Sequence, residues 1–79
     1  MSNQEKYDKA FGASFSLEAS RDLSTLEYSQ IPEWDSIGHM ELMAALEDSF
    51  DITLDTDDII EFSSYKRGLE ILAKYDVVI

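Results

Sequence analysis

The stretch DSIGHMELMAALEDSF, residues 35–50, decides the fold of this chain. Its apolar residues recur at intervals of three and four, which predicts one amphipathic α-helix from Asp35 to about Phe50. Asp35 stands where its side chain can cap the first turn, and Pro32 lies just upstream. The face that we expect to be buried consists of Leu42, Ala45, Leu46, Ser49 and Phe50.

The opposite face of this helix carries a short apolar strip, Ile37, Met40 and Ala44, among the carboxylates Glu41, Glu47, Asp48 and Asp51. The outer face of an ordinary amphipathic helix is polar throughout. We interpret the strip as a docking surface; the alternative is isolated surface apolar residues, which are normal. Within the same helix, Gly38 is expected to weaken the first turn by up to about 1 kcal/mol relative to Ala.

Upstream, helical spacing predicts a first helix from about Asn3 to Phe15, with an inner face of Tyr7, Ala10, Phe11 and Phe15. Residues 16–34 lose this periodicity and read as a long connection, held to the core by Leu17, Leu23, Leu26 and Ile31. A connection of this length is unusual in a small domain and indicates a functional role for the loop.

Downstream, a turn at Asp51 to Leu54 leads to a short helix at about Asp55–Phe62, with Ile59 and Phe62 inward. Ser63 or Ser64 then caps a last helix that runs to about Tyr75, with Tyr65, Leu69, Leu72 and Ala73 at helical spacing. The sequence predicts one all-α domain over residues 1–79. We expect a small bundle of three longer helices and one short third helix, with a long loop between the first two.

Charge narrows the choice of partners. The 79 residues contain no cysteine, and 17 acidic against 6 basic residues leave a net charge of −11. Residues 22–65 hold 12 of the acids and no Lys or Arg. Such a surface repels nucleic acid and anionic membranes and attracts basic protein patches. No segment reads as a targeting signal or membrane span, so we expect a cytoplasmic monomer.

Catalytic and metal-binding patterns fail on spacing. The acidic run from Asp51 resembles a calcium loop, but Thr56 stands where glycine is needed and Phe62 where a bidentate glutamate is needed. Ser36 and His39 lie one helical turn apart, a poor geometry for a catalytic set, and His39 is interpreted as a partly exposed helix residue. The three glycines are isolated, which excludes a phosphate loop. We therefore expect no catalytic residues, no metal and no enzymatic activity.

Residues 34–42, WDSIGHMEL, resemble the Asp-Ser-Leu/Ile motif of acyl carrier proteins and related thiolation domains. The similarity continues through the acidic second helix, the Asp-rich short helix and the final helix, and covers essentially the whole chain. It implies that Ser36, preceded by the motif residue Asp35, receives a covalent 4′-phosphopantetheine arm from coenzyme A. The thiol of that arm holds acyl intermediates as thioesters and carries them between enzymes.

The resemblance also implies which residues meet partner enzymes. These are Ile37, Met40, Glu41, Ala44, Glu47 and Asp48 on the second helix, with Asp57 and Asp58 extending the acidic surface. The implied partners are a phosphopantetheinyl transferase, a synthetase that loads acyl groups onto the carrier (acyl-ACP synthetase), ketosynthases, acyltransferases or other pathway enzymes with basic docking patches. Trp34, Gly38 and His39 depart from the common fatty-acid pattern, which leaves fatty acid, polyketide and specialised lipid synthesis open. The alternatives are a peptidyl or aminoacyl carrier, or an unmodified acidic interaction module.

Overall fold

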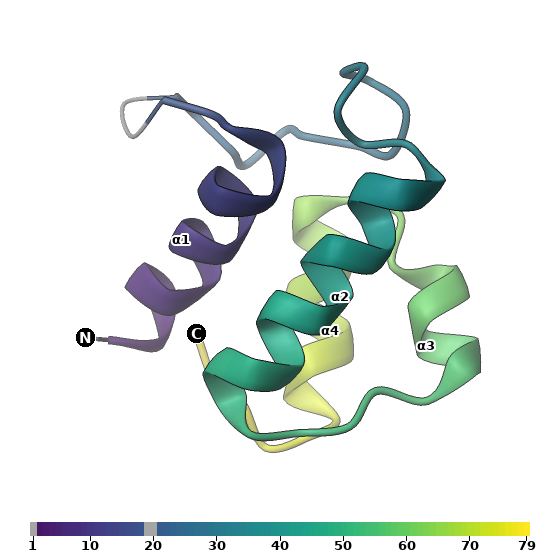
Figure 1. The fold of residues 1–79 in the computed structure, drawn as a ribbon. Helices are drawn as coiled ribbons and strands as arrows, with labels where there is room; N and C mark the ends of the chain where they lie inside the picture. The colour runs from purple at the N-terminus through teal and green to yellow at the C-terminus, as the bar shows by residue number, and fades with distance from the viewer. Residues whose placement is uncertain (1, 19–20) are drawn as a thin grey trace.

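Four helices make up the regular structure of the chain. The computed structural model describes residues 2–18 and 21–79, with α1 at Asn3–Phe15, α2 at Ser36–Phe50, α3 at Thr56–Glu61 and α4 at Tyr65–Ala73 (Figure 1). Among these residues the only β-type pairing is an isolated bridge between Glu27 and Ser64. The all-α prediction is confirmed. None of the helices in the described ranges is both long and apolar enough to span a membrane.

Side-chain caps begin three of the helices. Ser2 accepts a hydrogen bond from the backbone N–H of Glu5, Asp35 from that of Gly38 at 2.8 Å, and Ser64 from that of Arg67. Each cap satisfies a first-turn N–H group that has no partner within the helix. The caps predicted at Asp35 and at one of Ser63 and Ser64 are therefore confirmed, the second at Ser64.

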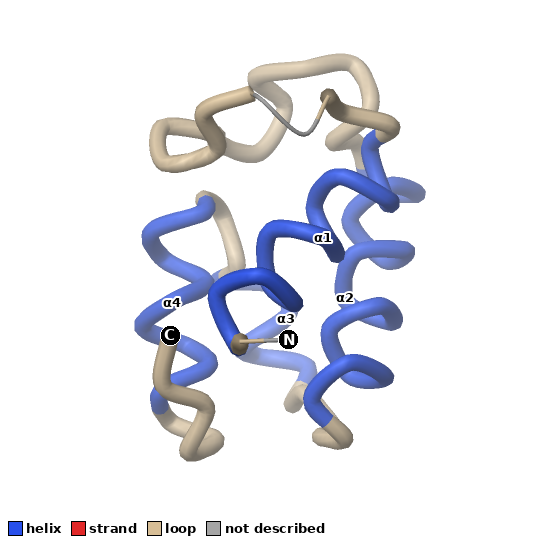
Figure 2. The backbone as a smooth tube through the Cα atoms, turned by 90° about the vertical axis from the view of Figure 1, so that its left-hand side faces the viewer, coloured by secondary structure: helices blue, strands red, loops and turns tan. Residues whose placement is uncertain are grey.

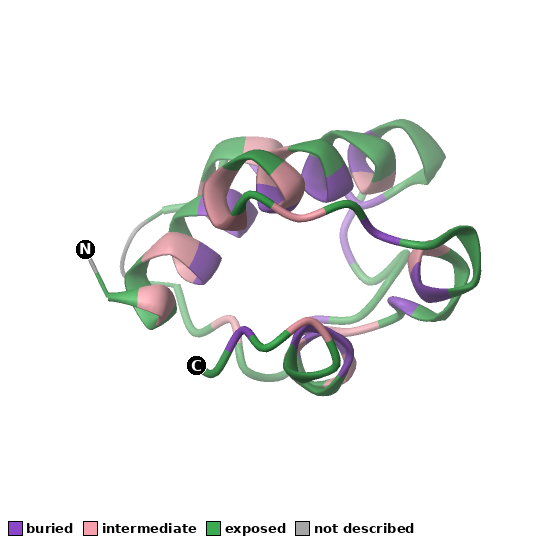
Figure 3. Ribbon diagram, turned by 90° about the horizontal axis from the view of Figure 1, so that it is seen from below, coloured by how far each residue is buried: buried purple, intermediate pink, exposed green. Residues whose placement is uncertain are grey.

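The helices surround one aromatic core, and the link between α1 and α2 crosses one end of the bundle (Figures 1 and 2). The buried faces of all four helices point inward (Figure 3). All four residues predicted for the inner face of α1 are buried, as are Leu26 and Ile31 of the link. The largest completely buried side chain is that of Trp34, at the end of this link.

Parts of the predicted inner faces are wrong. On α2 the buried residues are Gly38, Leu42, Met43 and Leu46, whereas Ala45, Ser49 and Phe50 are only half-buried. On α4 Ile71 is buried and Ala73 is exposed. The buried stripe of α2 therefore includes Gly38 and Met43, while Ala45 and Phe50 pack against the core but stay partly exposed.

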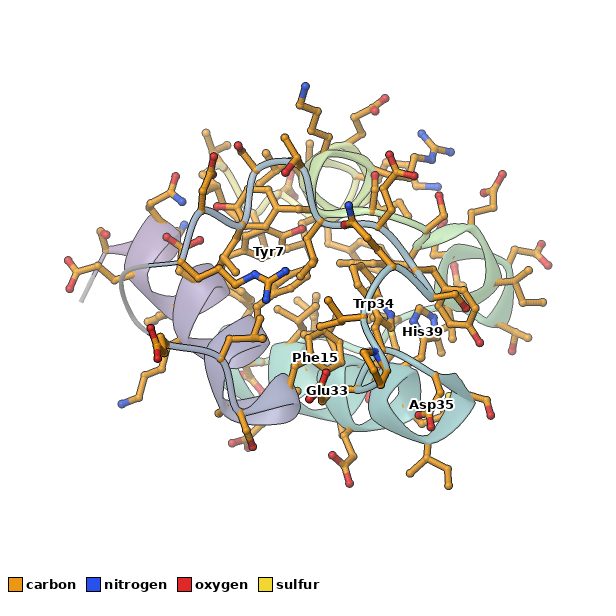
Figure 4. The ribbon with its side chains drawn as sticks, turned by 90° about the horizontal axis from the view of Figure 1, so that it is seen from above. Tyr7, Phe15, Glu33, Trp34, Asp35 and His39 are labelled. Atoms are coloured by element: carbon orange, nitrogen blue, oxygen red, sulfur yellow. The ribbon has the colours of Figure 1, made fainter. Side chains whose placement is uncertain are left out.

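Gly38 has a packing role that its sequence context does not indicate. A Cβ atom at this position would lie 2.0 Å from the carbonyl oxygen of Glu33 and 3.2 Å from the ring of Phe15. The glycine therefore lets the end of the link pass directly against α2, a packing role in addition to the expected weakening of the first turn. This close approach lets the Trp34 ring enter the core beside the start of α2 (Figure 4).

Candidate functional site

Ser36 lies at the exposed start of α2, beside a surface groove. It is the first residue of the helix, directly after the capping residue Asp35. The groove has a volume of about 380 Å³ and runs between the link, α2 and α3, with a lining of Tyr28, Ser36, His39, Met40, Ile59, Ile60, Phe62 and Ser63. A flexible group attached to Ser36 would thus begin at the rim of a largely apolar groove.

Three exposed apolar side chains line this groove: Met40 is 54% exposed, Ile60 74% and Tyr28 43%. Ile37, which follows Ser36 in the sequence, is 72% exposed and lies outside the lining. Ile37 and Met40 lie on the face predicted to dock a partner, and the structure brings Ile60 of α3 and Tyr28 of the link to the same area. Sequence reasoning missed Ile60, although the pair Ile59-Ile60 held the signal: adjacent helical residues point about 100° apart, so only one of them can face the core.

The predicted acidic residues divide into exposed and engaged groups. Glu41, Asp48 and Asp57 are exposed, as is the apolar Ala44. Glu47 is half-buried, and its Oε2 accepts a hydrogen bond from the backbone N–H of Leu54 at 2.8 Å. The Glu47 carboxylate therefore stabilises the turn after α2, and its charge is only partly available at the surface.

Asp58 lies in the interior, and the expectation that it extends the acidic surface is wrong. It is 5% exposed and accepts hydrogen bonds from Lys74 Nζ at 2.5 Å and from the Tyr75 hydroxyl at 2.6 Å. The hydrogen bond from Lys74 lowers the pKa of the Asp58 carboxyl below its ordinary value, and the same contact raises the pKa of Lys74. Asp58 thus fastens α3 to the end of α4.

His39 connects three parts of the fold. Its Nδ1 accepts a hydrogen bond from Trp34 Nε1 at 2.9 Å, and its Nε2 lies 2.7 Å from the carbonyl oxygen of Ile59. An indole nitrogen only donates and a carbonyl oxygen only accepts, so the two contacts fit the tautomer in which Nδ1 accepts and Nε2 donates. Both ring nitrogens of His39 are engaged in these hydrogen bonds and neither is directed to Ser36.

The position of His39 was only partly foreseen. The ring is half-buried, as expected, but it points into the bundle toward Trp34 (Figure 4). Trp34 and His39 are five residues apart, on either side of the Asp35 cap, so the bond depends on how the link enters the helix. The contact with Ile59 depends on the packing of α3 and leaves no signal in the sequence.

Other features of the described residues offer less chemistry. They contain no group of three or more His, Cys, Asp or Glu side chains poised to hold a metal ion. A hollow of about 750 Å³ lies between α1 and the first part of the link, and its lining mixes Asp8, Lys9, Glu18 and Arg21 without Ser36. Ser36 and the groove beside it are therefore the candidate site.

Comparison of the chain with protein families, curated proteins and solved structures found no match. Function is therefore inferred from the site and from the motif around Ser36.

Proposed function

We propose that this chain is an acyl carrier protein whose Ser36 bears a 4′-phosphopantetheine arm. The observation that carries the proposal is the exposed serine at the first position of α2, in an Asp-Ser-Ile motif, beside exposed Ile37 and Met40. The helical arrangement supports it, since two long helices separated by a long link, a short α3 and a final α4 are what the resemblance implies. The cargo is an acyl group held as a thioester.

The attachment reaction needs little from this chain. Ser36 Oγ attacks the phosphorus that bears pantetheine in coenzyme A, a new O–P bond forms, and the bond from this phosphorus to the bridging oxygen of the pyrophosphate breaks. Adenosine bisphosphate leaves, and the transferase takes the hydroxyl proton. The N-terminus of α2 favours the resulting phosphodiester, while the nearby carboxylates of Asp35 and Glu41 oppose it. No activating base is required at Ser36, in keeping with the engagement of both nitrogens of His39.

The docking surface of the proposed carrier consists of Ile37, Met40, Glu41, Ala44 and Asp48 on α2, with Asp57 and Ile60 on α3. All seven are exposed. Carboxylates steer a basic partner and set its orientation, and the apolar side chains supply a small contact that is buried on binding. A phosphopantetheinyl transferase and acyl-transferring enzymes with basic patches fit this surface. The contact is small, which suits a carrier that must leave each enzyme.

The attachment is tested by intact mass. Incubation with coenzyme A and a broad-specificity transferase is expected to add about 340 Da, the mass of the phosphopantetheine group. Ser36→Ala should abolish the gain. Ser63→Ala is the matched control, because Ser63 is also exposed and lines the same groove. A wild-type chain that gains no mass while a known carrier is modified in parallel would refute the proposal.

The docking surface is tested by charge reversal. Glu41→Lys and Asp48→Lys should slow modification by the transferase, whereas Glu70→Lys, at an exposed position on α4, should have little effect. An unmodified acidic interaction module makes a different prediction. In that case Ser36→Ala would leave partner binding intact, and only the charge reversals would abolish it.

A further inference from the structure

The space between α2 and α3, beneath the groove at Ser36, is closed by a chain of side chains. His39 lies one turn after Ser36, and its ring joins Trp34 of the link to the backbone of Ile59 in α3, at 2.9 and 2.7 Å. Trp34 is completely buried, so its N–H group depends on His39 for a partner. Separating α3 from α2 would break the bond to Ile59 and disturb the position of the ring that holds Trp34.

Aromatic rings fill the volume behind this contact. The His39 ring stacks on Trp34 with centroids 6.2 Å apart and an angle of 17°, and it meets the edge of Phe62 at 6.2 Å. Trp34 in turn stacks on Phe15 at 5.2 Å. A flexible chain that entered here would have to displace rings that pack on one another from Phe15 of α1 through Trp34 of the link to His39 of α2 (Figure 4).

Hydrogen bonds also connect α3 to the residues that follow α4. Asp58 is bound by Lys74 and Tyr75, and the Tyr75 hydroxyl also accepts a hydrogen bond from the backbone N–H of Asp55 at 2.9 Å. The helix is therefore fixed to α2 on one side and to the end of α4 on the other. A movement of α3 away from α2 would strain both sets of contacts.

We infer that His39 keeps the bundle closed to the cargo, so that the acyl group on the arm stays outside and belongs to a short or polar class. This inference rests on the proposed attachment at Ser36. A long apolar chain left outside would keep its surface in water, which is unfavourable, whereas a short, hydroxylated or amino-bearing group loses little by exposure. The carrier is thus suited to small polar thioesters that its partner enzymes reach directly.

For the test, a broad-specificity transferase loads the wild-type chain with acetyl or decanoyl phosphopantetheine from the matching coenzyme A thioester. Intact mass confirms the loading. Each thioester is then treated with hydroxylamine, whose nitrogen forms a bond to the carbonyl carbon as the C–S bond breaks and the thiol leaves. A closed bundle predicts rates within about twofold of each other, because neither carbonyl is protected. It also predicts melting temperatures within about 1 °C.

Two outcomes would overturn the inference in distinguishable ways. A decanoyl thioester protected about tenfold, with a melting temperature raised by several degrees, would mean that the protein shelters the chain, and it would leave the proposed function intact. A chain that accepts neither group would refute the attachment at Ser36 and this inference with it. His39→Ala adds a second readout, since opening the contact should slow cleavage of the decanoyl thioester relative to the acetyl one. Glu70→Ala, at an exposed position on α4 outside the groove, should not have this effect. The wild-type comparison decides the matter even if His39→Ala fails to fold.

Discussion

Replacing Gly38 with alanine separates the effect of helix propensity from the effect of tertiary packing. Propensity alone favours alanine within a helix by about 1 kcal/mol. At Gly38, however, the added methyl carbon would lie 2.0 Å from the Glu33 carbonyl oxygen. Gly12 in α1 is the matched control, because the nearest atom to its added Cβ is the carbonyl oxygen of Leu17 at an ordinary 3.8 Å.

The magnitude follows from the distance. The Glu33 carbonyl must retreat by about 1 Å to reach even the 3.0 Å below which real Cβ contacts essentially never fall. Glu33 directly precedes Trp34, which stacks on Phe15 and donates to His39, so the shift disturbs the core. Overpacking costs about 1 to 3 kcal/mol, and a clash that moves backbone by about 1 Å belongs to the upper part of this range, about 2 to 3 kcal/mol. A gain in propensity of about 1 kcal/mol offsets part of this cost. We expect Gly38→Ala to lower the free energy of unfolding by about 1 to 2 kcal/mol, and Gly12→Ala to raise it by up to about 1 kcal/mol.

Urea unfolding followed by circular dichroism measures both changes. A loss of about 1 kcal/mol should also lower the melting temperature by about 4 to 8 °C in a domain of this size. The signs are the decisive result, since the same substitution in two helices should act in opposite directions. Equal or greater stability for Gly38→Ala would refute the argument that the link packs against this glycine.

Three further predictions concern charge and pH. Asp58→Asn should lower the melting temperature at neutral pH, while Asp57→Asn, with the same change in charge at an exposed position, should leave it unchanged or slightly raised. The pKa of the Asp58 carboxyl is lowered from 3.8, so the stabilisation from this carboxylate is present above pH 3.8 and is lost as the pH falls toward the folded-state pKa. In this acid range the melting temperature of Asp58→Asn should therefore change less with pH than that of Asp57→Asn. At high pH stability should fall as the pH rises. Burial and the hydrogen bond to Asp8 raise the pKa of Tyr65 from 10.0 to about 12, so the folded chain should lose stability between pH 10.0 and about 12. A free energy of unfolding that stays constant across this range would contradict the placement of Tyr65. Finally, added salt or millimolar Mg²⁺ should raise the melting temperature, because the net charge of −11 destabilises the folded chain through repulsion; no response to either would mean that the acids are too far apart to interact.

Much of the fold was predictable because it depends on local physics. Helical spacing placed α1, and the caps at Asp35 and Ser64 follow from the preference of short polar side chains for free first-turn N–H groups. The candidate site was equally accessible, since Ser36 and the exposed strip of Ile37 and Met40 lie within one turn of a single helix. A pattern along one element can be recognised without knowing what packs against it.

The rest was decided by contacts between elements distant in the sequence. Asp58 and Lys74 are 16 residues apart, and nothing in the acidic run around Asp58 distinguishes its buried carboxylate from the exposed one of Asp57. His39 meets Ile59 across 20 residues, and Gly38 owes its role to the path of the preceding link. The sequence by itself determined the helices, their caps and the position of Ser36, because each depends on neighbours along the chain. Only the tertiary structure decided which polar groups hold α3 in place and whether the bundle beneath Ser36 is closed, because both depend on which faces meet after folding.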